Sequence, residues 1–209
     1  MRKLVLLVAL LGIVPVSTSA APIQVGDIAV VNYGTPHYGS GGQFRLTPAG
    51  TSPNAFDAFD TFCVQTTEYI NPDGATQFRV AGISTSTAGN SSKALDSRAA
   101  WLYEQFSLGM LGANFSYSTN AHAGELQRAI WRFMGESGYS SESNQFTQYF
   151  DTHATPVGIG NVRVLNLQYM NGSPAQDQLV HITPVPEAGS LGLVLTGLAG
   201  LAIRMRRRQ

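Results

Sequence analysis

Apolar and polar positions alternate in two separate parts of this chain, which is the pattern of β-strands. We predict strands at residues 28–33, 44–47, 61–65 and 76–82, and a closing hairpin with strands at 162–169 and 178–183. The glycine-rich segment YGTPHYGSGGQ (33–43) is predicted to be a loop. Within 61–65, side chains alternate across the strand, so Phe62 and Val64 are expected on one side and Cys63 on the other.

Between these two parts, apolar residues recur every three or four positions, which predicts helices. Residues 92–109 carry one such stripe, with Ser92 expected as the N-cap and Gly109 as the stop; it consists of Leu95, Ala99, Leu102 and Phe106. A second helix is predicted at residues 120–134, and a short helical turn at 143–150. We therefore expect an α+β fold: a mostly antiparallel sheet or sandwich built from both ends of the body, with an insertion of two or three helices.

The first 21 residues have the composition of a secretory signal peptide. Arg2 and Lys3 precede an apolar run that begins at Leu4, and small residues follow it. We expect signal peptidase to remove residues 1–21 and the remaining chain to be exported.

The C-terminal segment, residues 185–209, has three parts. Pro186 and Glu187 come first, an uncharged stretch covers residues 188–203, and the chain ends in a cluster of arginines. This arrangement resembles the PEP-CTERM sorting signal, although Ala188 replaces the second proline of the motif. The resemblance implies a hydrophobic helix that anchors the protein transiently in the inner membrane, with the arginines on the cytoplasmic side. It also implies cleavage by an exosortase and delivery to the cell surface or the extracellular matrix, usually in bacteria that make exopolysaccharide.

Residues 22–184 are then the body, and their charge narrows the choice of partners. They carry 7 basic and 12 acidic side chains, a net charge of −5. Nucleic acids and anionic membrane surfaces need clustered cations, so neither is expected as a partner. A length of about 160 residues suits one domain with a sizeable core.

The body contains one cysteine and no recognisable metal site. Cys63 has no partner for an intramolecular disulfide. The histidines show no paired ligand spacing, so we expect neither a metal nor another cofactor; they are His37, His122, His153 and His181. By composition alone, a single cysteine is most often a small buried apolar residue.

Two short motifs point to a different role for Cys63. FCVQ (62–65) and LQRAIW (126–131) resemble the aromatic-Cys strand and the Gln-x-Ala-Ile-Trp helix of bacterial thioester domains, which occur in surface adhesins. The resemblance implies an internal thioester between Cys63 and Gln127, formed with loss of ammonia. Such a bond would react with an amine or a hydroxyl on a matrix component or a neighbouring surface. Here Leu126 precedes the glutamine, where the family usually has threonine.

The residues around Gln127 suit a buried electrophile. Helical side chains lean toward the N-terminus, which places Gln127 over Ala123 and Gly124. A glycine inside a helix costs about 1 kcal/mol relative to alanine, so Gly124 indicates the close approach of another backbone. Trp131, four residues after Gln127, is expected to shield the bond from water. His122 is a candidate proton shuttle, and Tyr103 is another whose position the sequence does not give.

The leading hypothesis is a surface protein, not an enzyme, that attaches covalently through this thioester. The alternative is a structural or interaction protein of the exopolysaccharide layer in which Cys63 is inert. A third possibility is a cysteine hydrolase that pairs Cys63 with His122, His153 or His181, but the chain lacks a recognisable nucleophile turn.

Overall fold

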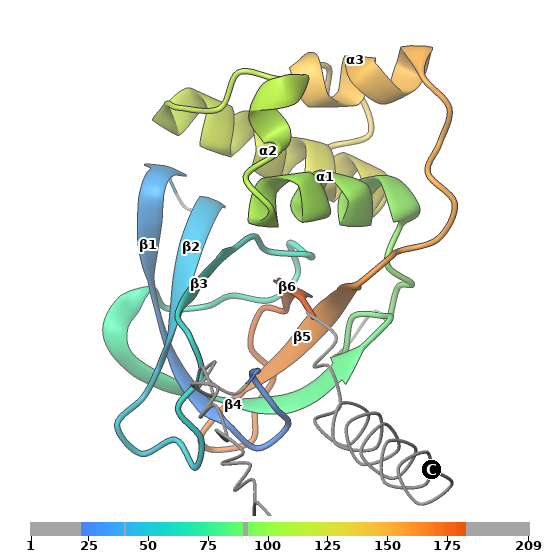
Figure 1. Cartoon of the computed structure of the whole chain (residues 1–209). Helices are drawn as coiled ribbons and strands as arrows, with labels where there is room; N and C mark the ends of the chain where they lie inside the picture. Colours follow the sequence, from blue (N-terminus) through green and yellow to red (C-terminus); the bar gives the residue numbers. More distant parts are fainter. Residues whose placement is uncertain (1–21, 40, 90–91, 183–209) are drawn as a thin grey trace, which may run out of the picture.

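The computed structural model describes residues 22–39, 41–89 and 92–182, and their fold is α+β. One antiparallel sheet curls into a near-barrel, and the helices cover one end of it (Figure 1). The strands are β1 (Ile28–Tyr38), β2 (Gly41–Pro48), β3 (Phe59–Thr61), β4 (Asp73–Ser84), β5 (Val162–Tyr169) and β6 (Gln178–His181). The helices are α1 (Ser97–Ser107), the short 3-10 helix η1 (Leu111–Ala113), α2 (Asn120–Phe133) and α3 (Gln145–Thr152).

The strand order is β3-β2-β1-β4-β5-β6, so the first and last strands of the sheet come from opposite ends of the body. They approach each other just after β3, where Cys63 forms an isolated antiparallel bridge with Gln178. Two backbone hydrogen bonds flank this bridge: Val64 N–H donates to Asp177 at 3.0 Å, and Leu179 N–H donates to Phe62 at 3.0 Å. The bridge therefore closes the near-barrel, and we call this place the seam.

The predicted loop at residues 33–43 is wrong in the structure. β1 continues to Tyr38 and β2 begins at Gly41, and the two pair from Ala29↔Pro48 to Tyr38↔Gly41 with one irregularity after Tyr33. Glycine permits this close pairing. A Cβ on Gly34 would lie 2.8 Å from the backbone oxygen of Gln43, closer than real side chains come. The same glycines that suggested a loop therefore let two strands pack tightly.

The helices lie close to their predicted positions. α1 begins at Ser97 with Asp96 as its N-cap, so the predicted N-cap at Ser92 is wrong. The Asp96 carboxylate accepts from the Arg98 N–H at 2.8 Å. The helix stops before Gly109, whose φ of +69° is the left-handed conformation expected of a terminating glycine. α2 matches its predicted span to within one residue and is capped by Thr119.

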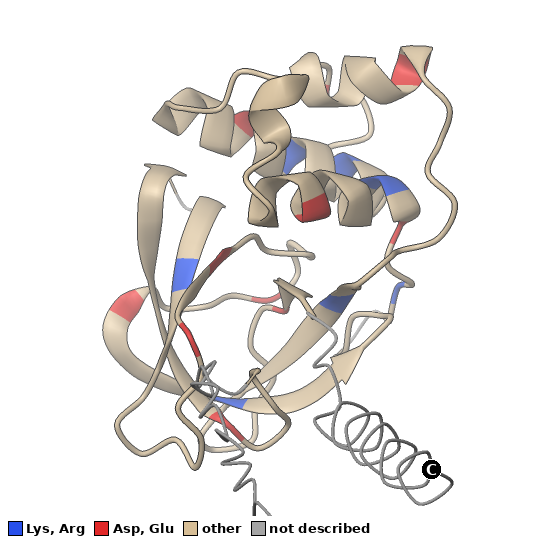
Figure 2. Cartoon of the chain, in the orientation of Figure 1, with Lys and Arg blue, Asp and Glu red and all other residues tan. Residues whose placement is uncertain are grey.

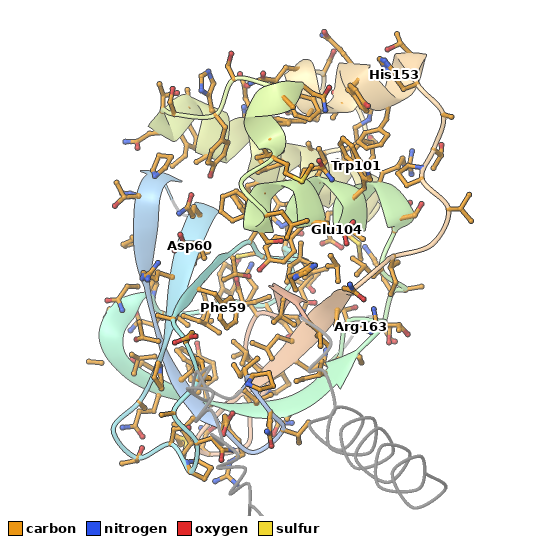
Figure 3. The ribbon with its side chains drawn as sticks, viewed as in Figure 1. Phe59, Asp60, Trp101, Glu104, His153 and Arg163 are labelled. Atoms are coloured by element: carbon orange, nitrogen blue, oxygen red, sulfur yellow. The ribbon has the colours of Figure 1, made fainter. Side chains whose placement is uncertain are left out.

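β3 ends at Thr61, so the predicted strand at 61–65 is only an extended segment with an isolated bridge at Cys63, and two apolar cores lie on its two faces. Phe62 and Val64 pack among the helices, whereas Cys63 packs with the barrel residues, so the predicted alternation is confirmed. Trp101 of α1 lies toward α3 (Figure 3), where its ring stacks on Tyr149 with centroids 5.3 Å apart.

Charged residues are spread over the strands and helices (Figure 2). Most basic residues of the described chain are paired with a carboxylate: Arg45–Asp60, Lys93–Glu136, Arg98–Asp96, Arg128–Glu142 and Arg132–Asp151. Among the described residues, no helix has both the length and the apolar character to cross a membrane. The predicted signal peptide and the sorting segment with Pro186 and Glu187 lie outside the described residues.

Candidate functional site: the seam at Cys63

Cys63 is fully buried and lies directly opposite Gln178 across the seam. The flanking hydrogen bonds come from Val64 and Leu179, so Cys63 and Gln178 themselves form a non-hydrogen-bonded pair. In such a pair the Cβ atoms are roughly 4.5–5.5 Å apart and the side chains are close together. The seam therefore brings the thiol and an amide side chain to the same face.

Two glutamines surround the sulfur. The Cys63 thiol donates to Gln176 Oε1 at 2.9 Å, and Gln178 Nε2 lies 3.5 Å from Sγ. Gln176 is itself held, because its Nε2 donates to the backbone oxygen of Gln65 at 2.7 Å. Gln178 Nε2 also lies 3.3 Å from the Gln176 backbone oxygen, whereas Gln178 Oε1 is buried and has no hydrogen-bond partner in the described chain. A buried amide with an unpaired oxygen is costly and calls for an explanation.

Gln127 hydrogen-bonds to the backbone of Cys63, and the hydrogen bonds of the described residues include none between Gln127 and the sulfur. Gln127 Oε1 accepts from the Cys63 N–H at 3.0 Å, and Gln127 Nε2 donates to the Cys63 carbonyl at 2.8 Å. Both backbone groups of Cys63 point away from β6, because the seam pair is non-hydrogen-bonded, and buried backbone groups need partners. The side chain of Gln127 supplies them, as a neighbouring strand would.

α2 can lie this close to the barrel because small residues face it. A Cβ on Gly41 would be 3.0 Å from Trp131 Cη2 and 3.3 Å from Gln127 Cγ. A Cβ on Gly124 would be 2.6 Å from Cγ of Tyr38. The neighbour at Gly124 is thus a tyrosine ring at the end of β1, where the sequence had indicated a backbone.

The thiol is held in its neutral form. Burial raises the pKa of the Cys63 thiol to about 12, although hydrogen bonding to Gln178 acts in the opposite direction. His122 and Tyr103 were the predicted proton shuttles. Among the described residues, neither forms a hydrogen bond to the sulfur of Cys63. The His122 ring accepts from the Ser118 N–H at 3.2 Å, and the Tyr103 hydroxyl donates to the Asp60 carbonyl at 3.0 Å.

Asp177, between the two glutamines in sequence, faces the other way. Its carboxylate accepts from the Ala88 N–H at 2.7 Å, from Asn166 Nδ2 at 2.9 Å and from the Leu167 N–H at 3.2 Å. Burial outweighs these bonds and raises the pKa of Asp177 to about 6. Asp177 anchors the segment that carries Gln176 and Gln178, so it fixes their common direction toward Cys63.

Two hollows beside the seam share Trp131 and Tyr139 in their linings. One, of about 230 Å³, we call the aromatic groove; it is lined by Tyr33, Phe44, Thr66, Tyr69, Ile70, Pro72, Trp131, Tyr139 and Gln176. The other, of about 210 Å³, lies against α2 and includes Tyr38, Gly41, Gly124 and Gln127. Gln176 therefore belongs both to the wall of the aromatic groove and to the surroundings of the sulfur.

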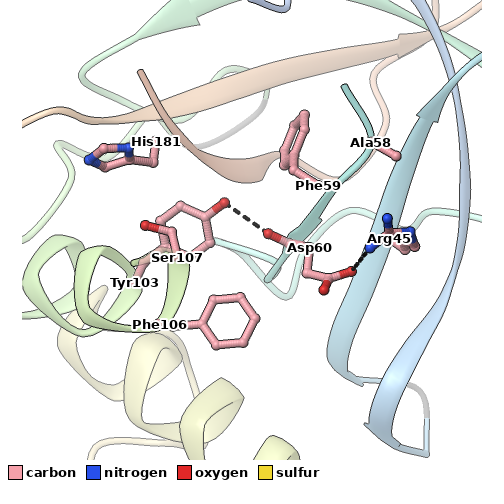
Figure 4. Close-up of a pocket in the computed structure, with 8 residues that line it drawn as sticks. All are labelled: Arg45, Ala58, Phe59, Asp60, Tyr103, Phe106, Ser107 and His181. Carbon is pink, nitrogen blue, oxygen red and sulfur yellow. Dashed lines mark hydrogen bonds and ion pairs between the residues drawn. The ribbon is translucent and has the colours of Figure 1, made fainter. Parts of the chain in front are cut away.

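A larger hollow, of about 440 Å³, opens between α1 and β3 (Figure 4). Its polar side chains already have partners: Arg45 pairs with Asp60 at 3.0 Å, and His181 Nε2 lies 3.7 Å from Glu104 Oε1. The lining of this hollow includes neither Cys63 nor the glutamines that surround it. We therefore place the candidate site at the seam.

No protein-family model, curated protein or solved structure matches this chain. The described residues also contain no cluster of three or more His, Cys, Asp or Glu side chains that could hold a metal ion.

The residues predicted from the sequence to form the site included Cys63, Gln127, Gly124 and Trp131. They did not include Gln176 and Gln178, which surround the sulfur in the structure. The sequence QDQ (176–178), which leads into the last predicted strand, could have indicated both glutamines, because residues two apart in an extended segment share a face. What that face meets depends on the closure of the near-barrel, which the sequence pattern does not specify.

Proposed function

We propose that this protein is an exported surface protein that forms an internal thioester between Cys63 and Gln178 and uses it for covalent attachment. The observation that supports this most directly is the seam pair, in which Gln178 Nε2 lies 3.5 Å from Cys63 Sγ. Export and tail sorting are proposed from the composition of residues 1–21 and from the resemblance of residues 185–209 to a sorting signal.

The bond would form by attack of Cys63 Sγ on Cδ of Gln178. The Sγ–Cδ bond forms, the Cδ–Nε2 bond breaks, and the thiol proton leaves with the nitrogen as ammonia. The product is an acyl group on a thiolate leaving group, which an amine or hydroxyl can attack. The reaction also removes a buried thiol and a buried amide whose oxygen is unpaired. Its cost in folding stability is therefore small.

The other residues of the site would position this bond. Gln127 holds the backbone of Cys63, and Gln176 orients the thiol through the contact at 2.9 Å. Trp131 belongs to the same apolar cluster as Cys63 and would limit access of water. The Cys63–Gln127 bond expected from the resemblance stays a prediction, but both polar atoms of the Gln127 amide are occupied by backbone groups, which favours Gln178 as the acyl donor.

The second candidate function is a structural or interaction protein with an inert thiol. One observation favours it: Cys63 is fully buried and its thiol is already hydrogen-bonded. The same burial disfavours a cysteine hydrolase, because a hydrolase needs an accessible thiolate with a nearby base.

Intact mass spectrometry of the secreted chain, followed by peptide mapping after treatment with methylamine, separates these functions. We expect the mature chain to be lighter by one ammonia, and methylamine to add its full mass at the side chain of Gln178. The Cys63→Ala variant is the matched control and should show neither change. The peptide map identifies the acyl donor without any further substitution, so it does not depend on how well variants fold.

Each other outcome supports a different conclusion. Methylamine on Gln127 would establish the bond predicted from the motifs. An unmodified mass with Cys63 recovered as a free thiol would leave the structural role. Turnover of a chromogenic ester that disappears in Cys63→Ser would establish the hydrolase.

A further inference from the structure

The aromatic groove has a lining suited to a neutral ligand. It consists of aromatic rings, two aliphatic side chains and two uncharged polar groups, Thr66 and Gln176, and none of its residues is charged. The nearby carboxylate of Glu136 is buried and occupied, because it accepts from Thr66 at 2.7 Å and pairs with Lys93 at 2.5 Å. The groove therefore presents ring faces and hydroxyls without a fixed charge.

Two of its rings are unusually open to solvent. Tyr69 is 79% exposed and Tyr33 is 47% exposed, although both are large aromatic side chains. Tyr139 packs on Trp131 with centroids 4.8 Å apart. Open tyrosines around a tryptophan offer flat apolar faces with hydroxyl groups at their edges, which is the chemistry that stacks on and hydrogen-bonds to a polyhydroxylated ring.

Trp131 adds an unused donor. The indole is nine-tenths buried, and its Nε1–H has no hydrogen-bond partner within the part of the chain that the structure describes. A buried donor without a partner is costly unless a ligand or water satisfies it. A hydroxyl group of a bound ligand is a suitable acceptor.

The groove also leads to the reactive pair. Gln176 lines it and holds the Cys63 thiol, and the Gln176 N–H donates to the Tyr69 carbonyl at 3.1 Å. The Gln176 side chain therefore lies between a ligand in the groove and the sulfur.

We infer that the aromatic groove binds a neutral saccharide and that a sugar hydroxyl is the acyl acceptor of the site. The covalent half of this inference rests on the proposed thioester. In that step the hydroxyl oxygen bonds to Cδ of Gln178, the Cδ–Sγ bond breaks, and the hydroxyl proton passes to the Cys63 sulfur. An ester joins the sugar to the protein and the thiol is regenerated.

A lysine side chain fits the groove less well than a sugar. At neutral pH its amine is protonated, and moving that charge into a small uncharged hollow is unfavourable without a carboxylate to pair with it. The lining of the aromatic groove supplies no carboxylate. A sugar hydroxyl enters without this cost.

Binding can be tested apart from the thioester in the full chain carrying Cys63→Ala. The probes are cellobiose, maltose, lactose and N,N′-diacetylchitobiose, with N-acetyl-lysine methylamide as the amine probe. The readout is the indole N–H signal of Trp131 in a ¹⁵N NMR spectrum, and the signal of Trp101, the other tryptophan, is the internal reference. We expect at least one disaccharide to shift the Trp131 signal and the amine probe to leave it unchanged.

Two exposed side chains give a matched pair of variants. Tyr69→Ala removes a groove ring and should weaken binding by about tenfold, the effect of losing one stacked aromatic contact. Met170→Ala removes an exposed side chain that does not line the groove and should leave binding unchanged. The saccharide inference is overturned if no disaccharide moves the Trp131 signal, if only the amine probe does, or if both variants bind alike.

The covalent step is read from the wild-type chain incubated with the disaccharide that binds. We expect the mass of the thioester form plus one whole disaccharide, at Gln178. If the chain carries the thioester but gains no sugar, the acceptor inference fails while the proposed function stands. If the chain shows no loss of ammonia, the proposed function fails, and the binding result alone decides whether the groove recognises sugars.

Discussion

The side-chain amide of Gln127 makes two hydrogen bonds to the backbone of Cys63, at 3.0 Å and 2.8 Å, 64 residues away in the chain. Helix α2 thereby supplies partners to the backbone N–H and C=O of Cys63, which do not pair with a neighbouring strand. This contact ties the position of the thiol to the position of the helix.

Replacement of Gln127 by alanine should destabilise the protein. It leaves the buried N–H and C=O of Cys63 without partners, and each such group costs about 1–3 kcal/mol. Urea unfolding followed by circular dichroism measures the change. Gln148→Ala, on the more exposed helix α3, is the control and should have a much smaller effect. Equal midpoints for the two variants would contradict the role assigned to Gln127.

Gly41→Ala should also lower stability, because the new methyl group would press on Trp131 and Gln127 at 3.0 and 3.3 Å. Overpacking of this kind costs about 1–3 kcal/mol. Gly50→Ala is the matched control, since nothing lies within 4 Å of its added Cβ. Thermal melting compares the two, and a Gly41→Ala protein as stable as Gly50→Ala would show that α2 moves freely at this contact.

Asp177 should make stability fall as the pH rises. Its pKa is raised by burial from 3.8 to about 6 in the folded protein, so the folded state holds this proton more tightly than the unfolded state. The resulting stabilisation is complete below the unfolded pKa and is lost as the pH rises through about 6, by up to about 3 kcal/mol.

Urea unfolding at several pH values between 4 and 7 tests this, with Asp177→Asn as the comparison. The free energy of unfolding of the wild type, relative to that of the variant, should decrease over this range. A constant difference between the two proteins would contradict the assignment.

Lys93 should stabilise the protein through Glu136, whose side chain is only 2% exposed and lies 2.5 Å from the ammonium group. Burial raises the pKa of Glu136, but the hydrogen bonds from Lys93 and Thr66 outweigh it, and the net pKa is lowered from 4.5. The contribution is therefore present above pH 4.5 and is lost as the pH falls through the folded pKa.

Lys93→Met leaves the Glu136 carboxylate buried without its cation and should cost about 1–3 kcal/mol at pH 7, a value reduced by the partial exposure of Lys93. Unfolding at pH 7 and pH 3.5 measures it. The difference between wild type and variant should shrink at the lower pH, and an equal difference at both values would contradict the pairing.

The sequence by itself determined the local elements of this protein. The span of α2 and the alternation of Phe62, Cys63 and Val64 follow from the periods of helix and strand, so both could be predicted from spacing alone. The resemblance carried by Gln127, Ala129, Ile130 and Trp131 predicted that α2 contacts the segment of Cys63, although not through which atoms.

Only the tertiary structure decided which side chains meet at the sulfur. The closure of the near-barrel sets Cys63 against Gln178, which are 115 residues apart, and this pairing depends on how six strands curl and on the register between distant segments. No local spacing encodes that register. The glycines of residues 33–43 are a second example. Glycine suits both an open loop and two strands in close contact, so the sequence predicted a loop, and only the pairing of β1 with β2 shows that these residues form strands.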